Sequence, residues 1–328
     1  MKAIRIHKAG DLDVIQFDTV PAPKPGPDQV VIKPSIAGVN YIDTYFRSGL
    51  YPVQFPFTLG QECGGEIGEV GENVKDLKKG DIVIAMTSSS FAERVVADRY
   101  RVVKLPEEVD LRSATAILLQ GLTAVTLTHA SYEVKSGDWV LVHAVSGGVG
   151  LVLAQICKAL GAHVIGTTST AEKAKLAKAN GAEHVFMYED DIVARVKELT
   201  DGNGVQVVYD SVGKTTFDMN FDLVARLGTI VSFGQSSGMP EPLLLRRLTD
   251  KNLKVLRPGV FSYLTTQEEM EHYASILWDF MSKGQIQTNI WREYLLSAEG
   301  VQAAQRELTS RATTGKLLLR LWPSKDDE

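Results

Sequence analysis

The chain has 328 residues, 44% of them hydrophobic and 23% charged, with 40 acidic and 35 basic side chains and a formal net charge of −5. This mildly negative charge argues against a dedicated nucleic-acid surface, and no apolar stretch approaches the ~18 residues that a membrane span needs. With two cysteines, no disulfide framework and no signal-peptide pattern, the sequence is expected to be a cytoplasmic protein of about two domains.

The first third of the chain, up to about Thr123, is divided into short strand-like segments by glycine and proline. We expect strands over residues 2–7, 29–37, 66–70, 81–85 and 91–97. Short strands with frequent breakers are typical of a compact β-barrel rather than of a helical domain.

From Trp139 onward the pattern changes to strands that alternate with helices. Residues 139–144 form a nearly continuous apolar run, as in a strand that is covered on both faces. The expected helices are 149–160, 171–179, 191–199 and 215–226, and the expected strands are 163–167, 185–188, 205–210 and 229–233. This alternation predicts a parallel, doubly wound sheet with right-handed crossovers.

The C-terminal segment is expected to contain helices over residues 266–281 and 297–310 and a strand over 316–321. Because a lone helix and strand cannot bury themselves, this tail is expected to return to the N-terminal domain. The predicted domains are therefore residues 1–123 together with 266–328, and residues 124–265 between them.

A glycine-rich turn, HAVSGGVG at 143–150, joins the first parallel strand to its helix. A dinucleotide pyrophosphate needs a tight turn, a close backbone approach and the positive end of a helix. Ala144 stands where the usual fingerprint has its first glycine, and Gly150 allows the helix to pack on the strand. The expected cofactor contacts in this turn are Ser146, Gly147, Gly148 and Val149.

The end of the second parallel strand indicates which nicotinamide cofactor is bound. An NAD site carries Asp or Glu about 20 residues after the turn to bind the ribose 2′-OH, but residues 166–170 read GTTST. The Ser169 hydroxyl and the Lys173 ammonium, in the first turn of the next helix, would instead accept a 2′-phosphate. Tyr188, at the end of the third strand, is expected to reach the same pocket, so the sequence predicts NADPH.

Several segments together resemble a known family: NYIDTYFRSGLY at 40–51, GGEIGEVG at 64–71, SGGVG at 146–150, YDSVG at 209–213 and SFG at 232–234. They look like medium-chain dehydrogenases/reductases, and their combination is similar to the quinone oxidoreductase (zeta-crystallin-like) branch. The resemblance covers essentially the whole chain. It implies a GroES-like β-barrel catalytic domain built from both termini, a Rossmann doubly wound parallel-sheet domain between them, and an active site in the cleft. It also implies a homodimer formed through the edge of the Rossmann sheet.

The same resemblance addresses whether the chain binds a metal. Zinc-dependent relatives hold the catalytic ion with a cysteine, the histidine of a Gly-His-Glu sequence and a further cysteine or acid. Here Asn40 stands at the first position and Gln61 at the second, and the loop near residues 87–91 has no cysteine. None of the six histidines falls on a zinc spacing, so we expect no metal.

A metal-free reductase needs an acceptor that takes hydride readily, and a quinone fits because its reduction produces an aromatic ring. The resemblance implies that the amides of Asn40 and Gln61 hold the nicotinamide or a substrate oxygen. Tyr45 and Tyr51 are expected to line the pocket, Tyr45 also matching a nucleotide-contact position, while aromatic packing explains Tyr51 equally well. Asp43 is expected to order its loop rather than to donate a proton.

The resemblance and the strand ends supply the remaining expected cofactor contacts. A family threonine beside the nicotinamide matches Thr123, and a family arginine near the 2′-phosphate matches Arg311, which could equally be a surface residue. Ligands of open α/β sheets bind at the carboxyl ends of the strands. This rule adds Ser211, Phe233, Gly234 and Ser236.

The function predicted from these residues is an NADPH-dependent quinone reductase. Reduction of an activated carbon–carbon double bond in an alkenal or enone shares the hydride step and is the alternative within enzymes. Some relatives in the resemblance bind AU-rich RNA or accumulate as crystallins, but the net charge of −5 makes RNA a secondary expectation.

Overall fold

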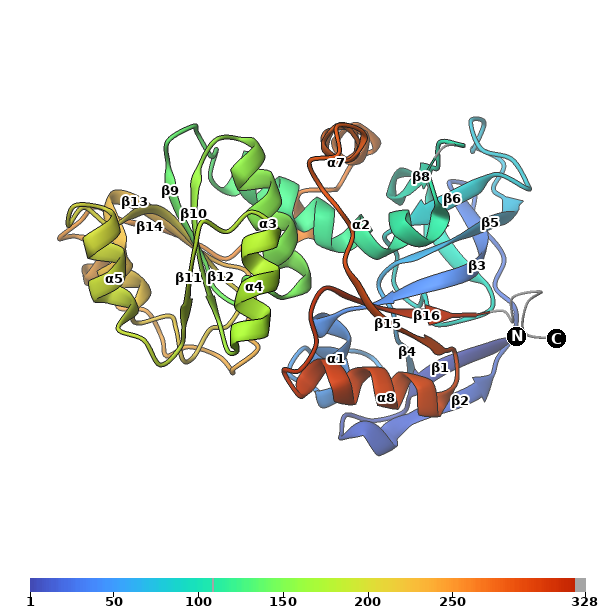
Figure 1. Ribbon diagram of the computed structural model, residues 1–328. Helices are drawn as coiled ribbons and strands as arrows, with labels where there is room; N and C mark the ends of the chain where they lie inside the picture. The colour runs from blue at the N-terminus through green and yellow to red at the C-terminus, as the bar shows by residue number, and fades with distance from the viewer. Residues whose placement is uncertain (108, 322–328) are drawn as a thin grey trace. The chain divides into compact units, whose positions relative to one another are not determined.

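The computed structural model of the protein describes residues 1–107 and 109–321 (Figure 1). Two compact units are formed by these residues. Unit 1 consists of the described residues of Met1–Leu119, Leu264–Ala274 and Thr288–Glu328. Unit 2 consists of Gln120–Tyr263 and Ser275–Gln287. No helix within the described residues is both long enough and apolar enough to cross a membrane.

Unit 1 is built on two β-sheets. The smaller sheet has the order β2-β1-β4, with β1 at Lys2–Ile6, β2 at Ile15–Thr19 and β4 at Phe57–Thr58. The larger has the order β15-β16-β3-β5-β6-β8, and β7 also pairs with β3. Its strands are β3 (Gln29–Val39), β5 (Cys63–Val70), β6 (Ile82–Ala85), β7 (Val95–Asp98), β8 (Val102–Lys104), β15 (Ile290–Leu295) and β16 (Lys316–Arg320).

The interior of unit 1 is apolar, with Ile4, Ile32 and Ile67 fully buried in one cluster. Glycine in β5 lets the strands approach closely, because a Cβ at Gly65 would lie 2.1 Å from the carbonyl oxygen of Lys33. The C-terminal strand β16 pairs antiparallel with β3 and parallel with β15.

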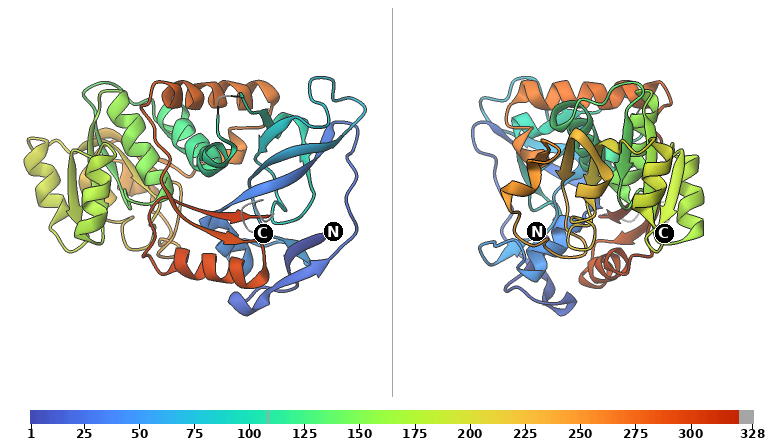
Figure 2. Two further views of the ribbon diagram at one scale, coloured as in Figure 1. Left: turned by 45° about the vertical axis from the view of Figure 1, so that its right-hand side comes forward. Right: turned by 90° about the vertical axis from the view of Figure 1, so that its left-hand side faces the viewer.

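Unit 1 also contains α8 (Ala298–Thr309), α1 (Tyr41–Ser48), the first part of α2 (Leu111–Thr126) and the first part of α7 (Gln267–Ser282). Helix α8 lies along β15 and β16, as Figure 2 shows. Helices α1 and α2 were not expected from the sequence, which suggested only short strands in this region. Helix α1 begins with a capping box between Asn40 and Asp43. Its length of 8 residues is too short for a clear helical periodicity.

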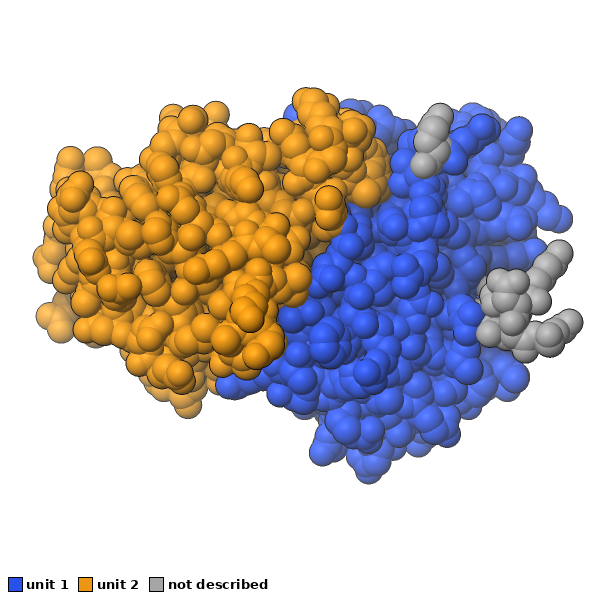
Figure 3. Space-filling model, in the orientation of Figure 1, with its two compact units in different colours: residues 1–119, 264–274, 288–328 blue, residues 120–263, 275–287 orange. Residues whose placement is uncertain are grey.

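Unit 2 (orange in Figure 3) is a parallel six-stranded sheet with helices on both faces. Its strands are β9 (Trp139–Val142), β10 (His163–Thr168), β11 (His184–Met187), β12 (Val205–Asp210), β13 (Val224–Ser232) and β14 (Lys254–Leu256). Helices α3 (Gly148–Ala159) and α4 (Ala171–Ala179) cover one face and α5 (Ile192–Leu199) the other (Figure 1). The strand order β11-β10-β9-β12-β13-β14 is that of a Rossmann fold, which confirms the predicted fold class.

Other sequence-based expectations for the elements also differ from the structure. The helix predicted over 215–226 is the four-residue α6 (Asn220–Leu223) after a series of turns, and β13 begins at Val224. The strand predicted over 91–97 is shorter than expected, because β7 begins at Val95. In unit 2, the parallel sheet has a sixth strand, β14, that was not expected. Helix α7 (Gln267–Ser282) matches its prediction and has residues in both units.

Candidate cofactor and substrate sites

The carboxyl ends of β9 and β12 form the switch point of the sheet in unit 2. These strands are neighbours, but their chain connections lead away in opposite directions, to β10 and to β13. Doubly wound sheets bind ligands in the crevice that forms at this place. The glycine-rich turn follows β9 directly, as the sequence predicted.

The turn after β9 presents the beginning of α3. Ala144 has a φ of 52°, and its carbonyl oxygen accepts the Gly147 N–H at 2.9 Å, which closes a tight turn. Gly147 is the N-cap of α3, and no side chain within the described residues caps it. The first N–H groups of this 12-residue helix are therefore suited to bind an anion.

Two glycines of the turn lie close to neighbouring groups. A Cβ at Gly150 would lie 2.5 Å from the carbonyl oxygen of Ala144, so glycine lets α3 lie against the turn, as predicted. A Cβ at Gly148 would lie 2.0 Å from Nε2 of Gln120. The side chain of Gln120, which the sequence analysis did not include, therefore lies beside the start of α3.

The ends of β10 and β11 lie next to the same turn. Ser146 Oγ and Thr168 Oγ1 are 2.9 Å apart, and the Tyr188 hydroxyl accepts the Ala144 N–H at 3.0 Å. Ser169 is exposed, and burial lowers the pKa of the half-buried Lys173. The structure thus brings Ser146 and Tyr188 together at the turn, beside a strand end that carries no carboxylate.

The loops after β12 and β13 are joined by backbone hydrogen bonds. The Ser236 N–H donates to the Ser211 carbonyl oxygen at 3.1 Å, and a Cβ at Gly234 would lie 2.6 Å from that oxygen. The predicted residues Ser211, Phe233, Gly234 and Ser236 are therefore grouped at adjacent strand ends. Arg257, which sequence reasoning missed, donates to the carbonyl oxygens of Ser232 at 2.7 Å and Gly234 at 3.3 Å.

Unit 1 contains a buried polar cluster around Asn40. Its Nδ2 group donates to Glu62 Oε1 at 2.7 Å and to the Gly38 carbonyl at 3.3 Å, while its Oδ1 accepts from Lys316 Nζ at 2.7 Å. Lys316 and Glu62 form an ion pair in which both side chains are fully buried. The Asn40 amide is thus committed to this cluster, and sequence reasoning missed Glu62 and Lys316 because they lie 254 residues apart.

The neighbours of Asn40 are also buried. Asp43 accepts the Asn40 N–H at 2.8 Å and has no exposed surface, which agrees with its expected role in ordering the loop. Burial raises the pKa of Asp43 to about 7, against the lowering effects of the Asn40 N–H and the Lys316 charge. The Gln61 side chain is buried and donates to the Gly60 carbonyl at 2.9 Å.

The predicted tyrosines form an aromatic group on and after α1. The ring centroids of Tyr45 and Tyr51 are 5.2 Å apart, and those of Tyr45 and Tyr41 are 5.7 Å apart. Arg311 is exposed with a φ of 62°, and its charge lowers the pKa of Tyr41 while burial raises it. Arg311 therefore lies near this aromatic group in unit 1, whereas Thr123 is half-buried on α2 in unit 2.

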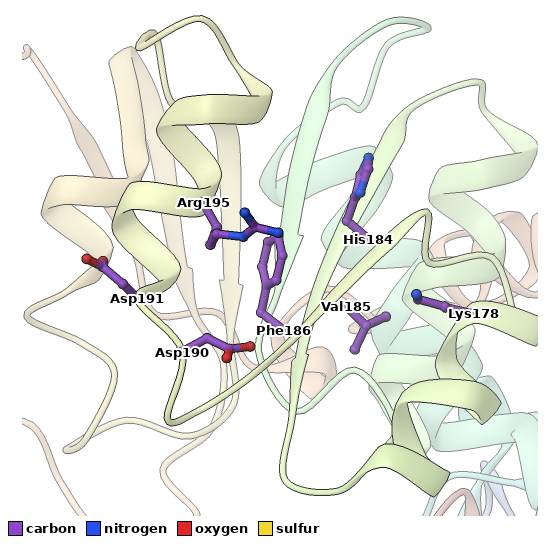
Figure 4. Close-up of a pocket in the computed structure, with 7 residues that line it drawn as sticks. All are labelled: Lys178, His184, Val185, Phe186, Asp190, Asp191 and Arg195. Carbon is purple, nitrogen blue, oxygen red and sulfur yellow. The ribbon is translucent and has the colours of Figure 1, made fainter.

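A separate pocket of about 500 Å³ lies between α4, β11 and α5 (Figure 4). The Arg195 guanidinium lies 5.6 Å from the centre of the Phe186 ring. The two aspartates at the pocket stabilise the nearby backbone, because Asp190 accepts the Met187 N–H and Asp191 caps α5. None of the predicted site residues lines this pocket.

Comparison with known proteins gives two family matches. The GroES-like domain of alcohol dehydrogenase matches residues 26–107, and a zinc-binding dehydrogenase domain matches residues 148–279. Within the described residues, no group of three or more His, Cys, Asp and Glu side chains is arranged to hold a metal. The fold and these matches define the class as an oxidoreductase of the alcohol dehydrogenase type.

Full-length relatives narrow this class. The probable quinone oxidoreductase of Schizosaccharomyces pombe is 42% identical over 318 residues, which cover 96% of each chain. The 2-haloacrylate reductase of a Burkholderia species is 32% identical over 327 residues, covering 96% of this chain and 97% of its own. The crystal structure of Escherichia coli quinone oxidoreductase complexed with NADPH has a TM-score of 0.94 at 38% identity, covering 98% of this chain and all of that one. The chain belongs to the quinone oxidoreductase branch of the medium-chain dehydrogenase/reductase superfamily, as the sequence predicted.

Proposed function

We propose that the protein is an NADPH-dependent quinone reductase that acts without a metal. The observation that carries the cofactor choice is the end of β10, where the hydroxyls of residues 167–170 and Lys173 stand in place of a carboxylate. A carboxylate there would repel the 2′-phosphate of NADPH, whereas a lysine beside a helix N-terminus attracts it. The related Escherichia coli enzyme, whose structure contains NADPH, supports this choice.

The residues of unit 2 fit such a dinucleotide. Among the described residues, no side chain caps the N-terminus of α3 at Gly147, which suits a pyrophosphate, and the Tyr188 hydroxyl accepts the Ala144 N–H beside it. Lys173, with Ser169 nearby in sequence, would bind the 2′-phosphate. Ser211, Phe233, Gly234 and Ser236 would line the wall formed by the loops after β12 and β13, and Thr123 and Arg311 complete the proposed contacts.

When bound, NADPH supplies a hydride, and a quinone that accepts it with a proton from water becomes a hydroquinone. The protein has to orient the two planar molecules and exclude competing acceptors. We assign contact with the acceptor to Tyr45, Tyr51 and Gln61. Asn40 would support them from the buried cluster, because both amide N–H groups of Asn40 are donated inside the protein.

The metal-free part of the proposal rests on the same cluster. The Lys316 ammonium donates hydrogen bonds to Asn40 Oδ1 and to Glu62, so oxygens that could bind a cation already contact a positive charge. Gln61, in the position of a zinc-binding histidine, provides an amide that is a poor zinc ligand.

Initial rates with NADPH and each of 1,2-naphthoquinone, 9,10-phenanthrenequinone and a 2-alkenal test this function. We expect the quinones to give kcat/KM values at least about tenfold above the 2-alkenal, since aromatisation favours their reduction. Absence of quinone turnover by a protein that binds NADPH would contradict the proposal.

A second candidate function is reduction of activated carbon–carbon double bonds. It is favoured by the 32% identity to a 2-haloacrylate reductase along nearly the whole chain. The same rate comparison decides between the two, because a double-bond reductase would prefer the 2-alkenal or 2-chloroacrylate over both quinones.

We also propose that the protein is a homodimer joined through an edge of the unit 2 sheet. The edge strands of this sheet are β11 and β14. Unpaired strand edges readily pair with a second copy. Light scattering after gel filtration should give twice the monomer mass, and a monomer mass at micromolar concentration would contradict the pairing.

A further inference from the structure

A chain of buried polar side chains crosses the switch point of the sheet in unit 2. It is formed by Thr167 at the end of β10, His143 after β9, Asn220 at the start of α6 and Asp210 at the end of β12. Thr216, in the turns between β12 and α6, completes it. Each of these side chains is at most 2% exposed. Polar groups that are buried in this way are kept only when their hydrogen bonds are made.

The direction of the hydrogen bonds follows from the Asn220 amide. Its Nδ2 group donates to Asp210 Oδ2 at 2.7 Å, so its Oδ1 accepts from His143 Nε2–H at 2.8 Å. The other ring nitrogen of His143, Nδ1, then accepts the Thr167 hydroxyl at 2.9 Å. The histidine is thereby held as one neutral tautomer, and burial also lowers its pKa.

At the other end of this chain, the Asp210 carboxylate organises the loop after β12. Its Oδ1 accepts the N–H groups of Val212 at 2.8 Å and Gly213 at 3.0 Å, and the Thr216 hydroxyl at 2.9 Å. These bonds draw residues 212–216 around the end of β12. The turn that these bonds stabilise includes Gly213, which has a left-handed φ of 86°.

We propose that His143, Asn220 and Asp210 are positioning residues that hold the turn after β9 and the loop after β12 at a fixed separation. These two segments are the walls assigned above to the cofactor, so this inference rests on the proposed function. None of the three side chains needs to contact the cofactor. Their effect is to present the N-terminus of α3 and the Ser211 backbone together. The two segments then lose little conformational freedom when NADPH binds.

The test compares variants by NADPH affinity, by KM for NADPH and by kcat. His143→Leu removes both hydrogen bonds at similar volume, whereas His143→Gln keeps an amide that reaches the Nε2 position. We expect His143→Leu to raise Kd and KM for NADPH about tenfold, with kcat within about threefold, and His143→Gln to recover most of the affinity. A purely structural role would not produce this separation of KM from kcat, nor recovery by glutamine.

Thr216→Val has a matched control in the same unit. Thr200 is also buried, donates to the Val196 carbonyl at 2.8 Å and accepts the Gly204 N–H at 2.9 Å, but it precedes the amino end of β12. Thr216→Val and Thr200→Val should lower Tm by similar amounts, and only Thr216→Val should weaken NADPH binding. This pair decides the question if His143→Leu does not fold.

The outcomes separate this inference from the proposed function. Equal NADPH affinities in Thr216→Val and Thr200→Val, or wild-type affinity in a folded His143→Leu, would overturn the positioning role while the reductase function stands. A wild-type protein without measurable NADPH affinity would overturn both.

Discussion

Lys173 is the one cation of the first turn of α4, and burial lowers its pKa. If it binds the 2′-phosphate, Lys173→Ala should raise KM for NADPH at least about tenfold and leave KM for NADH within about twofold, because NADH lacks that group. Steady-state kinetics with both cofactors measure this difference. Lys175→Ala, on the exposed side of the same helix, is the control and should change neither value. Equal losses for both cofactors in Lys173→Ala would contradict the assignment.

The stability of the folded protein is expected to depend on the protonation of one buried carboxyl group, that of Asp43. Because burial raises its pKa to about 7 from 3.8, the folded protein keeps the proton over a pH range in which the unfolded chain has lost it. Its contribution to the free energy of unfolding therefore falls as pH rises from about 4 to about 7, by up to ~1.4 kcal/mol per pH unit, and is constant above that range.

Asp43→Asn removes this titration. Urea unfolding at pH 5 and pH 8 should show the variant gaining stability relative to wild type at the higher pH, by about 1–3 kcal/mol. Asp250→Asn, at an exposed position, serves as the control. A stability difference that does not vary between the two pH values would show that Asp43 titrates normally.

At the scale of elements, one ion pair joins the C-terminal strand to the centre of unit 1. Lys316 begins β16, Glu62 directly precedes β5, and Glu62 Oε2 also accepts the Leu119 N–H of α2 at 2.8 Å. Removing one partner of a buried pair leaves an uncompensated charge, so Lys316→Met should lower the free energy of unfolding by about 3 kcal/mol or more in urea titrations.

Two further variants make this prediction specific. The double variant Lys316→Met with Glu62→Gln should recover part of the loss, since no buried charge remains. Lys104→Met breaks an ion pair with Asp81 in which the lysine is 55% exposed, and it should cost less than about 1 kcal/mol. Similar losses in both lysine variants would mean that burial of the Lys316 pair has no energetic consequence.

The elements that the sequence predicted well are those whose pattern depends on local burial. Strands β9, β10 and β12 are covered by helices and are therefore apolar, and helices α3, α4 and α5 alternate with the strands. The helix expected at 215–226 was wrong at its end because the residues from Val224 onward form β13, where Val224 pairs with Val205 of β12. Helices α1 and α2 were missed because glycine and proline divide the surrounding sequence into short segments that resemble strands.

At the scale of the whole molecule, the proposed metal independence would most separate this chain from zinc-dependent dehydrogenases. Purified protein should contain far less than one equivalent of zinc by elemental analysis, and incubation with EDTA should leave the quinone reductase rate unchanged. Stoichiometric zinc that is lost together with activity would contradict the assignment of Asn40 and Gln61 as non-ligands.

The sequence by itself determined the fold class, the family, the glycine-rich turn between β9 and α3, and the absence of an acid at the end of β10. These features lie in continuous segments, where hydrophobic period, glycine spacing and charge act between near neighbours. Only the tertiary structure showed that Lys316 pairs with Glu62 and that His143, Asn220 and Asp210 form one hydrogen-bonded chain. Lys316 and Glu62 lie 254 residues apart and His143 and Asn220 lie 77 residues apart, so their pairing is set by strand order and burial, which no local pattern records.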